Sequence, residues 1–264
     1  MTSRTALVVT GGSSGLGAAA ALRFAAAGHT VHVFDIHPGA SAEPSPGTDG
    51  RIVFHQVDVR NDDSVRAAFE AVEQAGEKVR GIVHCAGIAA FGPSNPGHLV
   101  HAEKHVPLDN LGTVENVLNT NLLGTFVVLR HGAALMARNG WHPADENGFI
   151  IMTSSGAAFE GKVGQSAYTA SKAAIVGMTL PLAREFSAIG VRVVTIAPGL
   201  FDTPILDDTP KLERHVPYPG RVGDPDEFAR LAVHISENRY INADVIRIDG
   251  GIRGEFRSAS PFIR

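Results

Sequence analysis

The chain contains 264 residues, of which 44% are hydrophobic and 19% are charged, and its formal net charge at pH 7 is −4. This length is enough to bury a large core, and the charge balance argues against nucleic acid as a partner. The single cysteine, Cys85, excludes an intrachain disulfide and a cysteine-based zinc site. No apolar run approaches the roughly 18 residues of a membrane span. A first strand that begins at Thr5 is expected to leave no room for a signal or transit peptide, so we expect a cytoplasmic protein.

Short, almost continuously apolar segments alternate along the chain with segments of helical periodicity. The predicted strands are 5–10, 30–35, 51–57, 80–85, 148–153, 191–196 and 244–248. The predicted helices are 15–27, 62–75, 113–138, 167–188 and 225–235. Strands without polar alternation are typical of a parallel sheet that helices cover on both faces. The pattern predicts an α/β fold with a doubly wound parallel sheet of about seven strands. We expect one domain over residues 1–264.

Two segments interrupt this alternation. Residues 37–50 are rich in Pro, Gly and Ser, which indicates an exposed loop. Residues 89–110 contain Gly, Pro and several histidines without clear periodicity. His98, His101 and His105 are spaced to share one face of a helix, so the segment is either a metal-binding element or a solvated loop. Because no carboxylate completes the set, we expect no metal.

A glycine-rich turn follows the first predicted strand, where Thr10-Gly-Gly-Ser-Ser-Gly-Leu-Gly17 leads directly into a helix. Glycine permits a tight turn, a close approach of backbone to a pyrophosphate and close packing of helix against strand. Free amides and the helix dipole attract phosphates. Such turns also occur without a ligand, but the position after a first strand favours cofactor binding. The candidate cofactor-binding residues of this turn are Gly11, Ser13, Ser14, Gly15, Leu16 and Gly17.

Other candidates lie at the ends of later strands. Asp35 ends the second strand, 20 residues after Gly15, where a dinucleotide fold places an acid on the adenine ribose. A carboxylate there repels a 2′-phosphate, which favours NAD over NADP; the alternative is a solvated acid at a strand end. The remaining candidates, which alone would be ordinary strand-end residues, are Asp58 and Val59 after the third strand and Cys85, Ala86 and Gly87 after the fourth.

The most specific constellation is Ser155, Tyr168 and Lys172. Tyr168 and Lys172 are four residues apart on a predicted helix and therefore share a face, while Ser155 ends the fifth strand. Oxidation of an alcohol requires a base for the hydroxyl proton, and a tyrosine with a pKa of about 10 is a poor base at neutral pH. A nearby ammonium and a cationic nicotinamide both favour the phenolate. We expect Tyr168 to act as the base, Lys172 to lower the pKa of Tyr168, and Ser155 to orient the substrate oxygen.

Together these residues resemble the short-chain dehydrogenase/reductase family over the whole chain. The resemblance rests on TGGSSGLG, Asp35, Asp58-Val59, the CAG sequence at Cys85, Asn121, Ser155, the YTASK sequence at Tyr168, and Pro198-Gly199. It implies a Rossmann fold and a catalytic relay of Asn121, Lys172, Tyr168 and Ser155. It also implies that Pro198 and Gly199 lie beside the cofactor and that Thr203 holds the nicotinamide carboxamide.

The second half is similar to one branch of the family, that of 3-hydroxyacyl-CoA dehydrogenase type 2, also called 17-beta-hydroxysteroid dehydrogenase type 10. The branch implies a homotetramer that oxidises short 3-hydroxyacyl-CoA thioesters, with some activity on steroid alcohols. The NAD contacts that it implies are Ser14, Leu16, Asp35, Asp58, Val59, Cys85, Tyr168, Lys172 and Phe201. The chain departs from the family at His84, where asparagine is usual, and from the branch over residues 89–110.

Residues 200–222 follow the sixth predicted strand and are expected to form a lid beside the nicotinamide. The candidates for an acyl pocket are Leu200, Phe201, Ile205 and Leu206. Three cations either meet the phosphates of coenzyme A or are surface charges on a mobile loop, namely Lys211, Arg214 and Arg221. Small residues on helix 167–188 permit close helix pairing in an oligomer, namely Ala170, Ala173, Ala174 and Gly177.

We expect an NAD-dependent enzyme that interconverts a secondary alcohol and a ketone by hydride transfer. A short 3-hydroxyacyl-CoA is the expected substrate, and a steroid or other secondary alcohol is the alternative with the same chemistry. A non-catalytic NAD-binding scaffold is the alternative from another class of protein. The complete set of Ser155, Tyr168 and Lys172 argues against the scaffold.

Overall fold

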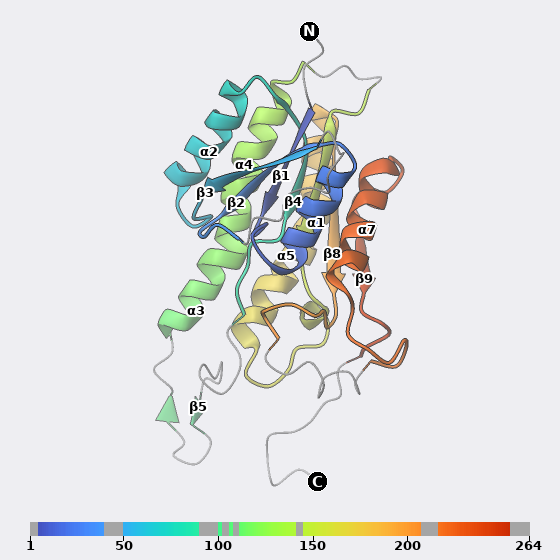
Figure 1. The fold of residues 1–264 in the computed structure, drawn as a ribbon. Coiled ribbons are helices and arrows are strands. Elements are labelled where there is room, and N and C mark those ends of the chain that lie inside the picture. Colours follow the sequence, from blue (N-terminus) through green and yellow to red (C-terminus); the bar gives the residue numbers. More distant parts are fainter. Residues whose placement is uncertain are drawn as a thin grey trace.

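A computed structural model describes residues 5–39, 50–89, 100–101, 106–107, 111–140, 145–206 and 216–253. Its central element is a sheet whose strands all run parallel (Figure 1). The strands are β1 (Thr5–Thr10), β2 (Thr30–Asp35), β3 (Arg51–Gln56), β4 (Lys78–His84), β7 (Gly148–Thr153), β8 (Val191–Pro198) and β9 (Val245–Ile248). Their order across the sheet is β3-β2-β1-β4-β7-β8-β9, which confirms the predicted doubly wound sheet of the Rossmann type.

Helices cover both faces of this sheet (Figure 1). The helices are α1 (Gly15–Ala26), α2 (Asp62–Gln74), α3 (Leu111–Leu118), α4 (Gly124–Ala137), α5 (Ser166–Phe186) and α7 (Pro225–Glu237). Helices α1 and α7 pack on one face, where Phe24 and Phe228 belong to one buried cluster. On the other face, Phe69 of α2, Val128 of α4 and Ile175 of α5 belong to a second cluster. Two apolar layers therefore enclose the sheet, which explains why its strands lack polar alternation.

Local sequence signals set the ends of several helices. The Asn61 side chain accepts a hydrogen bond from the Ser64 backbone N–H and caps α2. At α7, Asp224 and Glu227 form a reciprocal capping box, with Pro225 as the first helical residue. These caps satisfy backbone donors that a helix leaves free at its start.

The predicted helix 113–138 is wrong as one regular α-helix. It consists of α3, a π-helical turn at Asn119–Leu123, and α4. The Asn121 side chain turns inward and bonds to the backbone of Ile88, and Thr125 Oγ1 donates to the Asn121 carbonyl. These tertiary contacts accompany the wider turn, and helical periodicity alone does not reveal it.

The segment 89–110 also contains an unpredicted element. Strands β5 (Val100–His101) and β6 (Val106–Pro107) pair in antiparallel fashion. His98 and His105 lie outside the described residues, as does most of the expected loop 37–50. Among the residues that are described, no group of His, Cys, Asp and Glu is arranged to hold a metal ion.

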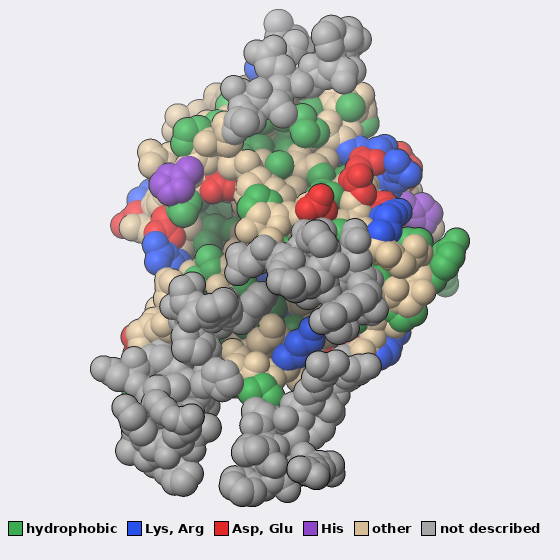
Figure 2. Space-filling view, turned by 60° about the horizontal axis from the view of Figure 1, so that its bottom comes forward, with side chains coloured by type: hydrophobic (Ala, Val, Ile, Leu, Met, Phe, Trp, Pro, Cys, Tyr) green, Lys and Arg blue, Asp and Glu red, His purple; other side chains and the backbone are tan. Residues whose placement is uncertain are grey.

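The carboxyl ends of the strands meet at one edge of the sheet, at the bottom of Figure 1. Figure 2 views the molecule from that end and shows acidic and basic side chains interspersed over the described surface. Nowhere in the described ranges does a helix combine the length and the apolar character needed to cross a lipid bilayer.

Candidate active site

A cavity of about 680 Å³ opens at the carboxyl edge of the sheet. All but two of the proposed catalytic and cofactor-binding residues line it. These lining residues are Gly11, Ser14, Gly15, Leu16, Gly17, Asp35, Asp58, Val59, Cys85, Ala86, Gly87, Ser155, Tyr168, Lys172, Pro198, Gly199, Phe201 and Thr203. Ser13 and Asn121 do not line the cavity, and each supports a residue that does. The volume is in the range of pockets that bind cofactors and other small molecules.

Residues that the sequence analysis did not select also line the cavity. They are Phe34, Ile36, Val57, Arg60, Ile88, Ala89, Asn116, Thr120, Thr153, Ser154 and Pro204. Most of these residues are sequence neighbours of a selected strand end, so extending each motif along the chain would have found them. Asn116 and Thr120 carry no such signal, because α3 and the π-helical turn reach the cavity only through the fold.

The glycine-rich turn packs so closely against neighbouring backbone that two of its positions have no space for a side chain. Gly11 has a φ of +64°, and a Cβ built there would lie 2.8 Å from the Ala86 backbone nitrogen. A Cβ at Gly17 would lie 2.2 Å from the Gly11 carbonyl oxygen, so a side chain would push α1 away from the turn. Ser14, the N-cap of α1, makes no side-chain capping bond within the described residues. Glycine at these two positions therefore allows the turn, the loop after β4 and the start of α1 to pack together at the cavity.

Asp35 is held in place at the end of β2 by backbone donors. Its Oδ2 accepts from the Ser13 N–H at 3.0 Å and its Oδ1 accepts from the Ile36 N–H at 2.8 Å. Ser13, which the sequence analysis placed among the cofactor contacts, thus contacts Asp35 and does not line the cavity. Because both carboxylate oxygens are anchored, the negative charge stays at the cavity wall.

Asp58 has an ion-pair partner that the sequence analysis missed. The Arg60 guanidinium donates from Nε at 2.9 Å and from Nη2 at 2.6 Å to the two carboxylate oxygens. Arg60 also donates from Nη1 to Asn116 Oδ1 at 3.0 Å. Hydrogen bonding to Arg60 lowers the pKa of Asp58, since the charged form gains the contact. This wall of the cavity therefore carries a paired charge rather than a free carboxylate.

Ser155 and Tyr168 meet across the cavity from different elements. Ser155 follows β7 and caps a short 3₁₀ turn, where its Oγ accepts from the Ala157 N–H at 3.1 Å. Tyr168 is in the first turn of α5, and its side chain forms a hydrogen bond with Ser155. Burial raises the pKa of Tyr168, and the hydrogen bond with Ser155 opposes that rise. The phenol is neutral in the chain alone.

Lys172 is buried one turn further along α5, with 6% of its surface exposed. Its Nζ donates to the Thr153 carbonyl at 3.0 Å and lies 5.8 Å from the centre of the Tyr168 ring. Burial lowers the pKa of Lys172 to about 8, because the ammonium loses its hydration. The spacing of Tyr168 and Lys172 predicts that this ammonium lowers the pKa of Tyr168. In the chain without cofactor the pKa of Tyr168 is raised, because burial outweighs the hydrogen bond with Ser155.

Asn121 lies behind the cavity wall. Its Oδ1 accepts from the Ile88 N–H at 2.8 Å, and its Nδ2 donates to the Ile88 carbonyl at 2.9 Å and to Ser171 Oγ at 3.1 Å. Gly87 separates it from Lys172, since a Cβ at Gly87 would lie 3.2 Å from Asn121 Oδ1 and 3.3 Å from Lys172 Nζ. The contacts of Asn121 therefore hold the loop after β4 against α5.

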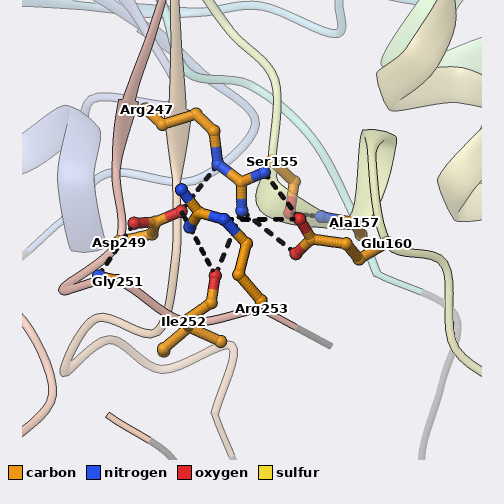
Figure 3. A network of polar contacts seen from close by, with 8 residues as sticks. All are labelled: Ser155, Ala157, Glu160, Arg247, Asp249, Gly251, Ile252 and Arg253. Atoms are coloured by element: carbon orange, nitrogen blue, oxygen red, sulfur yellow. Dashed lines mark hydrogen bonds and ion pairs between the residues drawn. The ribbon is translucent and has the colours of Figure 1, made fainter. Parts of the chain in front are cut away.

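A second ionic network fixes the turn that carries Ser155 (Figure 3). Arg247 of β9 donates from Nη1 and Nη2 to the two Glu160 oxygens, at 2.7 and 3.0 Å, and from Nε to Asp249 at 2.7 Å. Arg253 donates to the same Asp249 carboxylate at 2.9 Å. A Cβ at Gly199 would lie 2.7 Å from Asp249. The network therefore ties the loop after β7 to β9 and the loop that follows it, and Gly199 after β8 packs against Asp249.

The expected lid is described in part. Phe201, Ile205 and Leu206 line the cavity, as expected of an acyl pocket, whereas Leu200 does not. Arg221 does not line the cavity either, and it is ion-paired with Glu227 at 2.8 Å. Lys211 and Arg214 lie outside the described residues. Of the three proposed phosphate-binding cations, Arg221 is therefore committed to a contact on the protein itself.

The parallel sheet, the glycine-rich turn after its first strand, and the Ser–Tyr–Lys set in one cavity are the features of an oxidoreductase that uses a nicotinamide dinucleotide. The chain belongs to the short-chain dehydrogenase family, whose model matches residues 5–213. Enzymes of this family act on CH–OH groups and interconvert secondary alcohols and ketones, and the chain is an oxidoreductase of that kind.

Several relatives of the chain share one name. The chain is 41% identical over 251 residues to 3-hydroxyacyl-CoA dehydrogenase type-2 of Rattus norvegicus, which covers 93% of this chain and 94% of the relative. The protein of the same name from Homo sapiens is 42% identical, also over 251 residues, with 93% and 94% covered. Among solved structures, 3-hydroxyacyl-CoA dehydrogenase type-2 from Mycobacterium avium has a TM-score of 0.82 at 35% identity, with 96% of each chain covered.

Proposed function

We propose that this protein is an NAD-dependent dehydrogenase of short 3-hydroxyacyl-CoA thioesters, with residues 1–264 forming one catalytic domain. The observation that carries the proposal is the meeting of Ser155, Tyr168 and Lys172 in the cavity. Tyr168 and Ser155 share a hydrogen bond at the point where a substrate oxygen would be received. The names and the 41–42% identity of the relatives support the substrate class.

The residues present fit a dinucleotide. The turn from Gly11 to Gly17 would hold the pyrophosphate, because it combines close-packed glycines with a helix start. Asp35 would hold the adenine ribose, and its anchored charge supports NAD over NADP, since a 2′-phosphate would meet a carboxylate. Gly199 and Thr203 also line the cavity, and we place the nicotinamide beside them.

The proposed mechanism follows from the protonation of Tyr168. In alcohol oxidation, the substrate hydroxyl lies between Ser155 and Tyr168, Ser155 orients it, and Tyr168 Oη takes its proton as the carbon loses hydride. The bound oxidised nicotinamide supplies the hydride acceptor. Burial raises the pKa of Tyr168 even with Lys172 5.8 Å from its ring, so proton removal needs further positive charge, which an oxidised nicotinamide would add beside Lys172 when bound. In ketone reduction, the neutral phenol of Tyr168 would donate its proton to the substrate oxygen.

A comparison of substrates tests the proposal. The assay follows NADH oxidation with acetoacetyl-CoA, with longer 3-ketoacyl-CoA esters, and with free ketones including a ketosteroid. We expect kcat/KM to be highest for the short CoA esters, since the apolar wall formed by Phe201, Ile205 and Leu206 suits a short acyl chain. A strong preference for a free ketone would replace the CoA thioester by a steroid or other secondary alcohol. Tight NADH binding without turnover on the whole panel would favour a non-catalytic scaffold.

We also propose a homotetramer located in the cytoplasm. Exposed apolar side chains on the helix surfaces support self-association, with Phe126 of α4 at 48% exposure and Leu180 of α5 at 44%. Light scattering of the purified protein tests the oligomeric state, and a mass of one chain would exclude the tetramer. The composition, with one cysteine, supports a reducing compartment, and cell fractionation tests the location.

A further inference from the structure

A chain of buried polar side chains connects the two strand ends beside the glycine turn to the helix that carries Tyr168. Its members come from five elements and each is at most 2% exposed; they are Thr10, His84, Thr125, Asn121 and Ser171. Thr10 and His84 are direct neighbours at the ends of the paired strands β1 and β4. The mechanism proposed above assigns no role to His84.

The His84 ring bridges two hydroxyl groups. Its Nδ1 lies 2.8 Å from Thr10 Oγ1, and its Nε2 lies 3.0 Å from Thr125 Oγ1. Each hydroxyl has one further partner on the backbone. Thr10 Oγ1 accepts from the Ala86 N–H at 3.1 Å, and Thr125 Oγ1 donates to the Asn121 carbonyl at 2.6 Å.

A count of protons assigns the tautomer of the ring. Thr125 has one hydroxyl proton, and the Asn121 carbonyl takes it, so Thr125 must accept from a protonated Nε2 of His84. A neutral ring with its proton on Nε2 has an unprotonated Nδ1, which accepts the hydroxyl proton of Thr10, while Thr10 Oγ1 accepts from the Ala86 N–H. A proton on Nδ1 would remove the acceptor of the Thr10 hydroxyl. Burial, together with the nearby Lys172 ammonium, lowers the pKa of His84 to about 3, so the ring is neutral over the working range of pH.

Both ends of this chain reach the candidate site. On one side, Thr10 holds the Ala86 N–H in the cavity wall beside Gly11. On the other side, the Asn121 side chain donates to Ser171 Oγ at 3.1 Å, and Ser171 Oγ donates to the Tyr168 carbonyl at 2.7 Å. From the Ala86 N–H through Thr10, His84 and Thr125 to the Asn121 carbonyl, each group therefore donates in the same direction. A ring that donates at one nitrogen and accepts at the other is what gives the chain this direction.

We propose that His84 is a positioning residue, which as a neutral Nε2–H imidazole orients the hydroxyls of Thr10 and Thr125 and couples the cofactor-side loop after β4 to Asn121. The part that concerns turnover rests on the proposed dehydrogenase function, whereas the tautomer does not. The two parts are therefore tested separately.

The first experiment is long-range ¹⁵N–¹H NMR of the full chain labelled with ¹⁵N-histidine, with His84→Asn used to assign the signal. The expected result is a protonated Nε2 and an acceptor Nδ1, unchanged between pH 6 and 9. A signal that titrates in this range, or a proton on Nδ1, would overturn the assignment. This measurement requires no substrate and is valid even if the dehydrogenase proposal fails.

The second experiment compares kinetics with NADH binding. His84→Asn keeps an amide near the place of Nδ1 but is too short to reach Thr125, and Thr125→Val removes the same link from the other side. We expect each to lower kcat by about tenfold. The Kd for NADH, measured by fluorescence, should stay within about threefold, because the link from Thr10 to Ala86 remains. Thr125→Ser keeps the hydroxyl and is the matched control, with kcat close to that of the wild type.

A double variant decides whether the two residues act together. If His84 acts through Thr125, the His84→Asn/Thr125→Val protein should lose no more kcat than either single variant. Losses that multiply would overturn the coupling, as would equal kcat values for Thr125→Val and Thr125→Ser. If the wild type turns over no ketone, the dehydrogenase proposal fails, while the NMR result still decides the tautomer.

Discussion

Lys172 is a buried charge in the candidate site, and its replacement by methionine tests how this charge affects stability and activity. The pKa of Lys172 is about 8, against an ordinary value of 10.5, because burial disfavours the ammonium. This difference corresponds to roughly 3 kcal/mol of destabilisation of the folded state at pH 7, where the side chain is charged. Methionine has a similar length and no charge. It loses the hydrogen bond to the Thr153 carbonyl, which contributes about 1 kcal/mol. We therefore expect Lys172→Met to be more stable than the wild type by about 2 kcal/mol at pH 7.

The change of stability with pH depends on the shifted pKa of Lys172 and not on the size of its hydrogen-bond contribution. Between pH 8 and 10.5 the unfolded chain still holds the proton that the folded Lys172 has released, so the stability of the wild type rises with pH. The variant has no such group. Between pH 7 and pH 9.5, the free energy of unfolding of the wild type should therefore rise by about 2 kcal/mol relative to that of the variant.

The assay is urea unfolding followed by far-ultraviolet circular dichroism at both pH values, with activity measured in parallel. Lys78→Met is the control, because the exposed Lys78 also donates to a carbonyl, that of Asn139 at 2.8 Å. We expect the control to change stability by less than about 0.5 kcal/mol. Parallel pH curves for the wild type and Lys172→Met would refute the reasoning, as would a variant that keeps most of its kcat.

Three further substitutions test the site. Tyr168→Phe should reduce turnover by at least about 10³-fold and leave the Kd for NADH within a few-fold, because only the proton-transferring oxygen is lost; retention of most of kcat would remove Tyr168 as the base. Asp35→Ala should relax the preference for NAD over NADP, and an unchanged ratio of the two kcat/KM values would show that Asp35 does not set it. Glu160→Gln should lower the melting temperature and reduce kcat several-fold, because the ion pair with Arg247 holds the turn of Ser155. The same substitution in the exposed pair at Glu73 should have little effect on either, and equal effects at both positions would argue against the network.

The sequence alone was enough for the fold class and for most of the candidate site. The continuous apolar strands predicted the covered parallel sheet, since that pattern depends only on which residues are buried. The glycines between Gly11 and Gly17 could be found because a tight turn before a helix leaves a local signal. Tyr168 and Lys172 could be placed on one face because helical geometry fixes the relation of residues four apart.

Only the tertiary structure revealed the partners of these residues. Glu160 and Arg247 are 87 positions apart, and no local pattern shows that their loops adjoin. His84 departs from the family pattern in the sequence, yet its two hydroxyl partners come from β1 and α4. Burial of Tyr168, which raises its pKa in the chain without cofactor, likewise has no local sequence signal. Local sequence determines backbone preference and the face that is buried, whereas charge pairing and desolvation depend on elements that only the folded chain brings together.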